Sequence, residues 1–324
     1  MEKNNSIIFS VDGRTDLLKE IVDFTGNGFT EPISLGEMNN RKFSDGELNV
    51  DFNKSIRGKK VYLLTTPINS DEILKLEFAI DAARRASAHE IIPILPYFPY
   101  SRQDKRDQHR GSIGAKVLAK KLEMLGATGI ITMELHADQI EGFFDIPVTN
   151  IKGQYLFTEF IYNEHLRLGD VVLAATDAGG GKRVVKMQNR IRDKYGVSLP
   201  FVFAHKNRVE DNKVDEVIII GDVKDKNVIL LDDMCDTAGT LCANADKMIE
   251  LGAKNVSAVT THLILSGKAI DNIEKSSLSY VMGSNSLNVP KHEKLRTISV
   301  ASEIGKAILA NDYGISLSRI QNNK

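Results

Sequence analysis

Short runs of apolar, often β-branched residues alternate along the whole chain with stretches of helical spacing. Residues 74–86 and 113–125 are examples of the amphipathic helical stretches. Strands separated by helices form βαβ units, which require mostly parallel sheets covered on both faces. We therefore predict an α/β fold, with mostly parallel sheets flanked by helices. The predicted strands are 7–10, 61–65, 91–95, 130–133, 171–175, 201–204, 217–220, 228–231, 256–260 and 278–282.

The length of the chain, 324 residues, favours two domains. Single hydrophobic cores usually stop growing at about 250 to 300 residues. No linker rich in proline or glycine marks a boundary, but the series of strands restarts near Lys152. We expect one domain over residues 1–152 and a second over residues 153–324.

The charges of the chain nearly cancel, with 42 Lys and Arg against 43 Asp and Glu. No global field therefore attracts nucleic acid or an anionic membrane. No apolar stretch approaches the roughly 20 residues that span a bilayer, and residues 1–14 lack the pattern of a secretory signal. We expect a cytoplasmic protein without a nucleic-acid or membrane partner, in which Cys235 and Cys242 are free thiols.

The most informative turn follows the predicted strand 228–231. It begins with Asp232 and Asp233 and ends before helical spacing over 241–251. Backbone N–H groups at a helix start favour a phosphate, and neighbouring carboxylates can accept hydrogen bonds from two ribose hydroxyls. The turn predicts a sugar-phosphate site, although an ordinary turn with capping aspartates stays an alternative. Its residues are Asp232, Asp233, Met234, Cys235, Asp236, Thr237, Ala238, Gly239 and Thr240.

Other polar loops follow other predicted strands, and parallel sheets bind ligands beyond the carboxyl ends of their strands. The loop after 91–95 is long and basic, with Arg102, Lys105, Arg106 and Arg110 available to clamp phosphate oxygens. A loop of this length at a strand end is typical of a lid. A solvated loop held by salt bridges is the alternative.

Three further loops carry groups that suit a metal-bound polyphosphate. Glu134 and His136 follow one strand, and Asp177 precedes three glycines after another. Lys206 and Arg208 are two positions apart after a third strand, so in an extended segment both cations face the same side. Two such cations suit a transition state that accumulates phosphoryl charge. A packed histidine, a plain glycine connection and a charged strand edge are the alternatives. Neither a P-loop nor a dinucleotide fingerprint is present in the sequence.

Taken in order, these motifs closely resemble ribose-phosphate diphosphokinases, over nearly the whole chain. The resemblance implies two phosphoribosyltransferase-type domains and a homo-oligomer, commonly a hexamer. It implies an enzyme of nucleotide biosynthesis that transfers the β,γ-diphosphoryl group of Mg-ATP to the anomeric hydroxyl of ribose 5-phosphate and releases AMP. Mg²⁺ would be the cofactor. The matching segments are 43–47, 98–104, 135–145, 177–180, 205–208 and 232–240.

The resemblance also implies roles for single residues. Adenine and ATP would be held by Phe43, Asp45, Gly46, Glu47, Arg102 and Gln103. Lys206, Arg208 and Arg102 would be catalytic, and His136 and Asp177 would be associated with the metal. Ribose 5-phosphate would be held by Arg208, Asp232, Asp233, Asp236, Thr237, Ala238, Gly239 and Thr240.

A regulatory site follows from the same resemblance. In the phosphate-stimulated class of the family, inorganic phosphate as activator or ADP as inhibitor binds at a subunit interface. The residues of this chain at those positions are Ser55, Arg57, Ser87, Arg110, Ser316 and Ser318. We expect an allosteric anion site there.

The chain departs from the family pattern in several places. Glu134 stands where the family usually has aspartate, and Glu141 and Thr149 replace a polar uncharged residue and an aspartate. Residues 68–72 also differ from the usual pattern. Two alternatives therefore stay open: a regulatory homologue without catalysis, and a phosphoribosyltransferase that consumes the same product.

Overall fold

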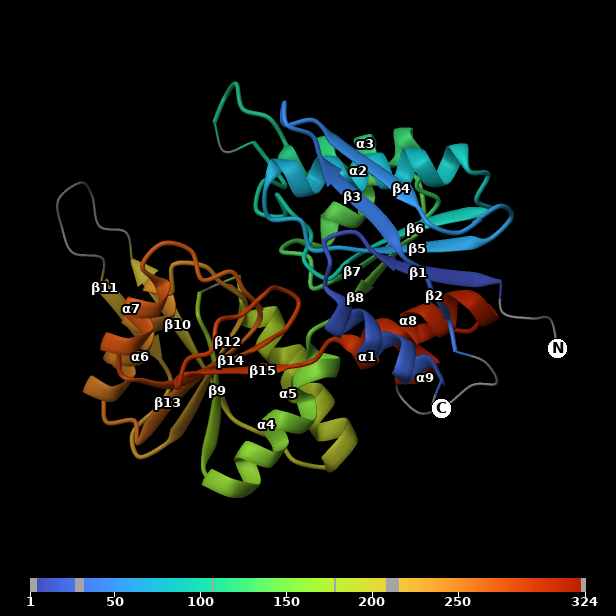
Figure 1. Cartoon of the computed structure of the whole chain (residues 1–324). Coiled ribbons are helices and arrows are strands. Elements are labelled where there is room, and N and C mark those ends of the chain that lie inside the picture. Colours follow the sequence, from blue (N-terminus) through green and yellow to red (C-terminus); the bar gives the residue numbers. More distant parts are fainter. Residues whose placement is uncertain (1–4, 27–31, 107, 178, 208–215, 322–324) are drawn as a thin grey trace. The chain divides into compact units, whose positions relative to one another are not determined.

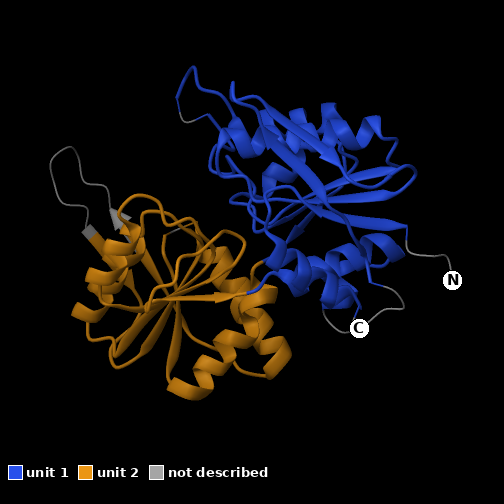
Figure 2. Cartoon of the chain, viewed as in Figure 1, with its two compact units in different colours: residues 1–152, 299–324 blue, residues 153–298 orange. Residues whose placement is uncertain are grey.

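The computed structural model describes residues 5–26, 32–106, 108–177, 179–207 and 216–321, without the side chains of 205–207 and 216. Two compact units make up the chain (Figure 2). Unit 1 comprises Met1–Lys152 and Ser299–Lys324, and unit 2 comprises Gly153–Ile298. The division falls where the sequence predicts it, after Lys152. The segment from Ser299 onward, however, belongs to unit 1 and not to the second domain as expected.

Unit 1 is built on a six-stranded parallel sheet in the order β2-β1-β5-β6-β7-β8 (Figure 1). The helices α2 and α3 bury their apolar stripes on one face, around Phe9, Leu63 and Leu95; α1 and α8 lie on the other face (Figure 1). The strands are β1 (Ser6–Ser10), β2 (Ser34–Leu35), β5 (Lys60–Leu64), β6 (Glu90–Leu95), β7 (Ile130–Met133) and β8 (Val148–Ile151). The helices are α1 (Thr15–Gly26), α2 (Ser70–Arg85), α3 (Gly114–Leu125), the 3-10 helix η1 (Asp138–Phe143), α8 (Ala301–Tyr313) and α9 (Leu317–Gln321).

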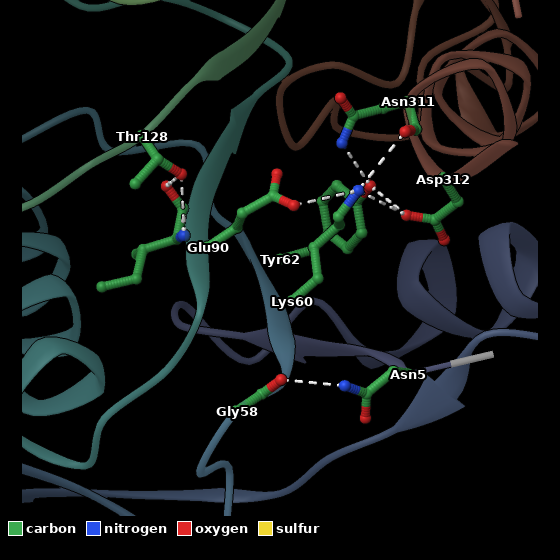
Figure 3. Close-up of polar contacts among 9 residues, drawn as sticks. Asn5, Gly58, Lys60, Tyr62, Glu90, Thr128, Asn311 and Asp312 are labelled. Carbon is green, nitrogen blue, oxygen red and sulfur yellow. Dashed lines mark hydrogen bonds and ion pairs between the residues drawn. The ribbon is translucent and has the colours of Figure 1, made fainter. Parts of the chain in front are cut away.

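The C-terminal segment joins unit 1 because α8 packs on α1 and is tied to β5 (Figure 3). The Tyr62 hydroxyl donates to Asp312 Oδ1 at 2.7 Å and accepts from Asn311 Nδ2 at 2.8 Å. Lys60 Nζ lies 3.5 Å from Asp312 Oδ1 and 3.3 Å from Glu90 Oε1. Burial raises the pKa of Tyr62, and nearby Asp312 adds to the rise, so the phenol stays a donor.

A short antiparallel hairpin, β3 (Met38–Lys42) and β4 (Leu48–Phe52), stands apart from the sheet of unit 1 (Figure 1). Phe52 anchors it through an edge-to-face contact with Phe9, with ring centroids 4.7 Å apart. The sequence did not predict these strands, because β3 is polar and mostly exposed and so lacks an apolar alternation.

Unit 2 is built on a seven-stranded sheet in the order β11-β10-β9-β12-β13-β14-β15, in which only the pair β10–β11 is antiparallel. Helices α4 and α5 pack on one face and α6 and α7 on the other. The strands are β9 (Val171–Ala175), β10 (Phe201–Asn207), β11 (Glu216–Ile220), β12 (Asn227–Cys235), β13 (Asn255–Leu263), β14 (Leu278–Ser284) and β15 (Leu295–Ile298). The helices are α4 (Gln154–Leu168), α5 (Gly181–Tyr195), α6 (Gly239–Glu250) and α7 (Ala269–Lys275).

The two units repeat one strand order. In unit 1, β1 has β2 on one side and the series β5, β6, β7, β8 on the other; in unit 2, β9 has β10 on one side and the series β12, β13, β14, β15 on the other. Every predicted strand is present, and the α/β fold is confirmed. None of the helices in the described ranges is long and apolar enough to cross a membrane.

Candidate active site

The turn between β12 and α6 presents the start of a helix to solvent. Ala238 precedes the helix with a left-handed φ of 61°, and no side chain caps the first turn through that position. A left-handed alanine costs free energy, and such residues cluster at functional sites. Thr237, Gly239 and Thr240 are exposed beside it. The N–H groups of the first turn are therefore placed to receive an anion.

The same turn is fixed from the chain segment that follows β13. Asn272 Nδ2 donates to the Thr237 carbonyl at 2.9 Å, and the Ser266 N–H donates to the Asp236 carbonyl at 3.1 Å. The Ser266 hydroxyl also donates to the Asp236 carboxylate. These contacts hold the backbone of the turn in place without a ligand, so little ordering remains to oppose binding.

Asp232 and Asp233 lie within β12 and not after it, because β12 continues to Cys235 alongside the equally long β13. The Thr176 hydroxyl donates to Asp232 Oδ2 at 2.8 Å. Arg183 of α5 reaches both carboxylates: Nη1 lies 3.2 Å from Asp232 Oδ1, and Nη2 lies 3.2 Å from Asp233 Oδ1. The structure thus adds Thr176 and Arg183 to the residues that the sequence indicated.

The ionisation of Asp232 is disfavoured in the folded chain. Burial raises its pKa, the hydrogen bond and charge of Asp233 raise it further, and the guanidinium of Arg183 acts in the opposite direction. The guanidinium of Arg183 and the hydrogen bond from Thr176 therefore favour the ionised form of Asp232 against the effect of burial.

The glycine turn after β9 is partly explained by packing. A β-carbon at Gly181 would lie 2.7 Å from a ring carbon of Phe203, so the close approach of helix and strand requires glycine there. Asp177 is exposed, and its Oδ1 accepts the Gly180 N–H at 2.7 Å. Its other carboxylate oxygen has no hydrogen-bond or ionic partner among the described residues. Lys206 lies in β10, but its side chain and all of Arg208 are outside the described residues.

The motif 43–47 forms the tip of the β3–β4 hairpin in unit 1. The Phe43 N–H donates to the Glu47 carbonyl at 2.8 Å, and the Glu47 N–H donates to Asp45 Oδ1 at 3.0 Å. Gly46 has a φ of 93°, which other residues rarely adopt. Phe43 is 52% exposed, so a large apolar residue is presented at the hairpin tip.

The long basic loop follows β6 and ends at α3. The Gln103 N–H donates to the Tyr100 carbonyl at 2.7 Å, and the Gln103 carbonyl accepts the Ala115 N–H at 3.3 Å. Arg102 and Arg110 are exposed on this loop. The structure therefore holds Gln103 against the start of α3 and leaves both guanidinium groups at the surface.

His136 lies exposed on the loop after β7. The loop begins at Glu134, which has a left-handed φ of 41°. Asn150 supports it, because its Oδ1 accepts the Leu135 N–H at 3.3 Å while its Nδ2 donates to Glu141 Oε1 at 2.6 Å. One of the departures from the family pattern, Glu141, is thus part of the support of the histidine loop.

Comparisons with known proteins show the family of the chain. The family of the N-terminal domain of ribose phosphate pyrophosphokinase matches residues 6–126, and the phosphoribosyl synthetase-associated domain matches residues 164–321. A ribose-phosphate pyrophosphokinase of Porphyromonas gingivalis is 42% identical over 308 residues, which are 94% of each chain. The chain belongs to the ribose-phosphate pyrophosphokinase family.

A crystal structure supports the same family. Phosphoribosylpyrophosphate synthetase from Mycobacterium smegmatis matches with a TM-score of 0.85 and 30% identity, over 96% of this chain and all of that one. The predicted family, fold and enzyme class, a diphosphotransferase of nucleotide biosynthesis, are confirmed.

The family's metal can be tested against the donors in this chain. No cluster of three or more His, Cys, Asp or Glu side chains that could hold a metal ion occurs in the part of the chain that the structure describes. Mg²⁺ needs no such cluster, since it is usually bound through one or two carboxylates, water and substrate phosphates. An exposed carboxylate such as that of Asp177 fits a metal carried by a nucleotide.

Four of the six residues indicated for regulation form two pairs. Arg57 Nη1 donates to Ser87 Oγ at 3.1 Å, and the hydroxyls of Ser316 and Ser318 lie 2.8 Å apart. Each pair offers donors to an anion at the surface of unit 1.

Proposed function

We propose that this chain makes 5-phosphoribosyl 1-diphosphate and AMP from Mg-ATP and ribose 5-phosphate in the cytoplasm, through the residues that its motifs indicate. The observation that carries the proposal is the open start of α6 beside the aspartate pair of β12. One end of that arrangement suits a phosphate, and the other suits a diol.

Ribose 5-phosphate would bind along the turn 232–240. Its phosphate would accept hydrogen bonds from the N–H groups at Ala238 and Gly239 and from the hydroxyls of Thr237 and Thr240. Asp232 and Asp233 would accept hydrogen bonds from the two ring hydroxyls, with Asp236 bordering the turn and Arg208 adding a cation.

ATP would bind to unit 1. The exposed Phe43 ring offers an aromatic face for adenine, and Asp45, Gly46 and Glu47 give the hairpin tip its shape and its acceptors. Arg102 and Gln103 would hold the polyphosphate from the long loop.

His136 and Asp177 would hold the Mg²⁺ of Mg-ATP. When bound, the metal neutralises phosphate charge and orients the chain of phosphates for in-line attack. Lys206, Arg208 and Arg102 would stabilise the charge that develops on the transferred group, while the loop 96–113 excludes water that competes for it.

The first experiment measures AMP release from Mg-ATP, with and without ribose 5-phosphate, for the natural protein and Lys206→Ala. We expect AMP only with the sugar and a large loss of kcat in the variant, because a cation facing the transition state acts on kcat. Lys226→Ala, half-buried in unit 2 outside these motifs, is the control and should keep full activity. No AMP under varied phosphate and metal would favour a regulatory homologue, and turnover of PRPP with a nucleobase in the absence of ATP would favour a phosphoribosyltransferase.

We further propose a homo-oligomer, commonly a hexamer in this family, in which the Phe43 hairpin serves the active site of a second copy. Mixing two inactive variants, Phe43→Ala and Lys206→Ala, then restores part of the activity, since some sites receive an intact half from each copy. Mixtures that stay inactive, although light scattering shows that the subunits exchange, would contradict the shared site.

Inorganic phosphate is proposed as an activator that binds near Ser55, Arg57, Ser87, Arg110, Ser316 and Ser318. Ser318→Asp combined with Arg110→Ala should make the rate insensitive to phosphate, because it adds an anion and removes a cation. Undiminished activation of that variant would remove the proposal.

A further inference from the structure

Arg183 is placed between two carboxylates that a β-strand would otherwise direct apart. Asp232 and Asp233 are consecutive in β12, and consecutive side chains of a strand point to opposite faces. Arg183, in the first turn of α5, meets both, with one terminal nitrogen 3.2 Å from Asp232 Oδ1 and the other 3.2 Å from Asp233 Oδ1. A planar guanidinium carries several N–H donors in a fixed fork, so it can bind two carboxylates at once and fix their relative orientation, which a compact ammonium group does not do.

The other atoms of Arg183 indicate that these two contacts set its position. Its Nε is buried and has no hydrogen-bond partner among the residues that the structure describes. An unpartnered buried donor costs free energy, which the two ionic contacts must offset. The side chain is 25% exposed, so it lies at the edge of the site and not in the apolar core.

We propose that Arg183 is a positioning residue for the sugar, which holds the carboxylates of Asp232 and Asp233 in the joint orientation that receives the hydroxyls of ribose 5-phosphate. This inference rests on the proposed function of the aspartate pair. Arg183 does not need to touch the sugar, because its effect passes through the two carboxylates.

The charges around the pair make the role measurable. Asp233 of β12 and Arg183 of α5 carry charges beside Asp232, whereas Thr176, directly after β9, and Thr260 of β13 are neutral neighbours. Without the guanidinium, two close carboxylates repel each other, and one binds a proton at higher pH. A protonated carboxyl accepts fewer hydrogen bonds from a sugar hydroxyl.

The test measures steady-state KM for ribose 5-phosphate, KM for ATP, and the pH dependence of kcat/KM for the sugar. We expect Arg183→Ala to raise the sugar KM about tenfold or more, with kcat changed much less, because the carboxylates bind substrate and transition state alike. The KM for ATP should stay unchanged. The acid limb of the pH profile, which reports groups of the free enzyme, should move to higher pH.

Arg183→Lys separates charge from geometry. It should return the acid limb toward its natural position, since the charge is restored, and leave the sugar KM raised, since the two-pronged contact is lost. Arg192→Ala is the matched control, because Arg192 is on the same helix, is exposed, and its guanidinium pairs with Asp193. It should leave every parameter unchanged.

Two results would overturn the inference. One is a folded Arg183→Ala variant with the natural sugar KM and acid limb; the other is an Arg183→Lys variant with the natural sugar KM, which decides the matter if the alanine variant does not fold. Calorimetric titration of ribose 5-phosphate into the natural protein and into Asp232→Asn tests the proposed sugar site separately from the role of Arg183. If the natural protein fails to bind the sugar, or Asp232→Asn binds it equally well, the sugar site itself is wrong.

Discussion

The two units share a strand order but treat the carboxyl ends of their central strands in opposite ways. In unit 1, Asp12 after β1 accepts the Thr66 N–H at 2.7 Å, and Arg14 Nη1 donates to the Thr66 hydroxyl at 3.0 Å. The start of α2 is closed by Asn69, which accepts the Glu72 N–H at 3.0 Å. In unit 1, therefore, hydrogen bonds join the loop that follows β1 to the loop that follows β5.

In unit 2 hydrogen bonds also join the neighbouring segments, but the equivalent acid and the equivalent helix start remain accessible. Asp177 after β9 is exposed, and α6 starts at a left-handed Ala238 without a side-chain cap. The loops differ as well: residues 96–113 connect β6 to α3 in unit 1, whereas only 264–268 connect β13 to α7 in unit 2. The repeated fold therefore has an exposed helix start beside an aspartate pair in one copy and a long basic loop in the other.

The largest expected effect is the difference in sugar kinetics between substitutions of Asp232 and of Asp12. Asp232→Asn should lower kcat/KM for ribose 5-phosphate about 100-fold, because a site built to bind hydroxyls loses an ionised acceptor. Since burial raises the pKa of Asp232, the natural rate should also fall with decreasing pH sooner than an ordinary aspartate would allow. Asp12→Asn should leave the sugar KM unchanged and lower the free energy of unfolding by about 1 to 2 kcal/mol. Equal effects of the two variants on the sugar KM would break the comparison.

A second prediction concerns the segment that only unit 1 receives from the C-terminus. Tyr62→Phe removes the phenol that links Asp312 to Asn311, and it should lower the free energy of unfolding by about 2 kcal/mol, because it leaves a buried carboxylate with fewer partners. Hydrogen exchange should accelerate in β5 and α8 and stay unchanged in unit 2. The double variant with Asp312→Asn should lose less than the sum of the single variants. Additive losses would show that the two side chains are not coupled.

The third prediction compares the two helix starts. Asn69→Ala removes the cap of α2 and should cost about 1 kcal/mol of stability. Thr237→Ala, beside the uncapped start of α6, should change stability by at most about 0.5 kcal/mol and raise the KM for ribose 5-phosphate instead. Urea unfolding and steady-state kinetics measure both. A stability loss in Thr237→Ala as large as that in Asn69→Ala would mean that α6 is capped after all.

The α/β fold could be predicted from the sequence, because buried parallel strands are apolar runs. The turn 232–240 could also be selected, because it places acidic residues beside small ones. The rest depends on contacts between distant positions. Arg183 lies 49 residues before Asp232, and Tyr62 lies 250 residues before Asp312. Neither pairing leaves a local pattern, which is why the arginine and the return of α8 to unit 1 were not predicted. The likeness of the two units could be expected only from the family resemblance, since it lies in strand order and not in residue spacing.

The smallest expected effect tests the long loop that distinguishes unit 1. A β-carbon at Gly114 would lie 2.4 Å from Gln103 Oε1, so Gly114→Ala must turn the Gln103 side chain away from the start of α3. A turned side chain costs little stability, because it is the free end of a flexible group. If Gln103 holds ATP, the KM for ATP rises a few-fold while the sugar KM stays constant, a change of about 1 kcal/mol or less. Gly142→Ala, where a β-carbon would meet nothing within 4 Å, is the control. A raised sugar KM in Gly114→Ala would assign the loop to the sugar and not to the nucleotide, and the proposed division of labour between the loop of unit 1 and the turn of unit 2 would then be wrong.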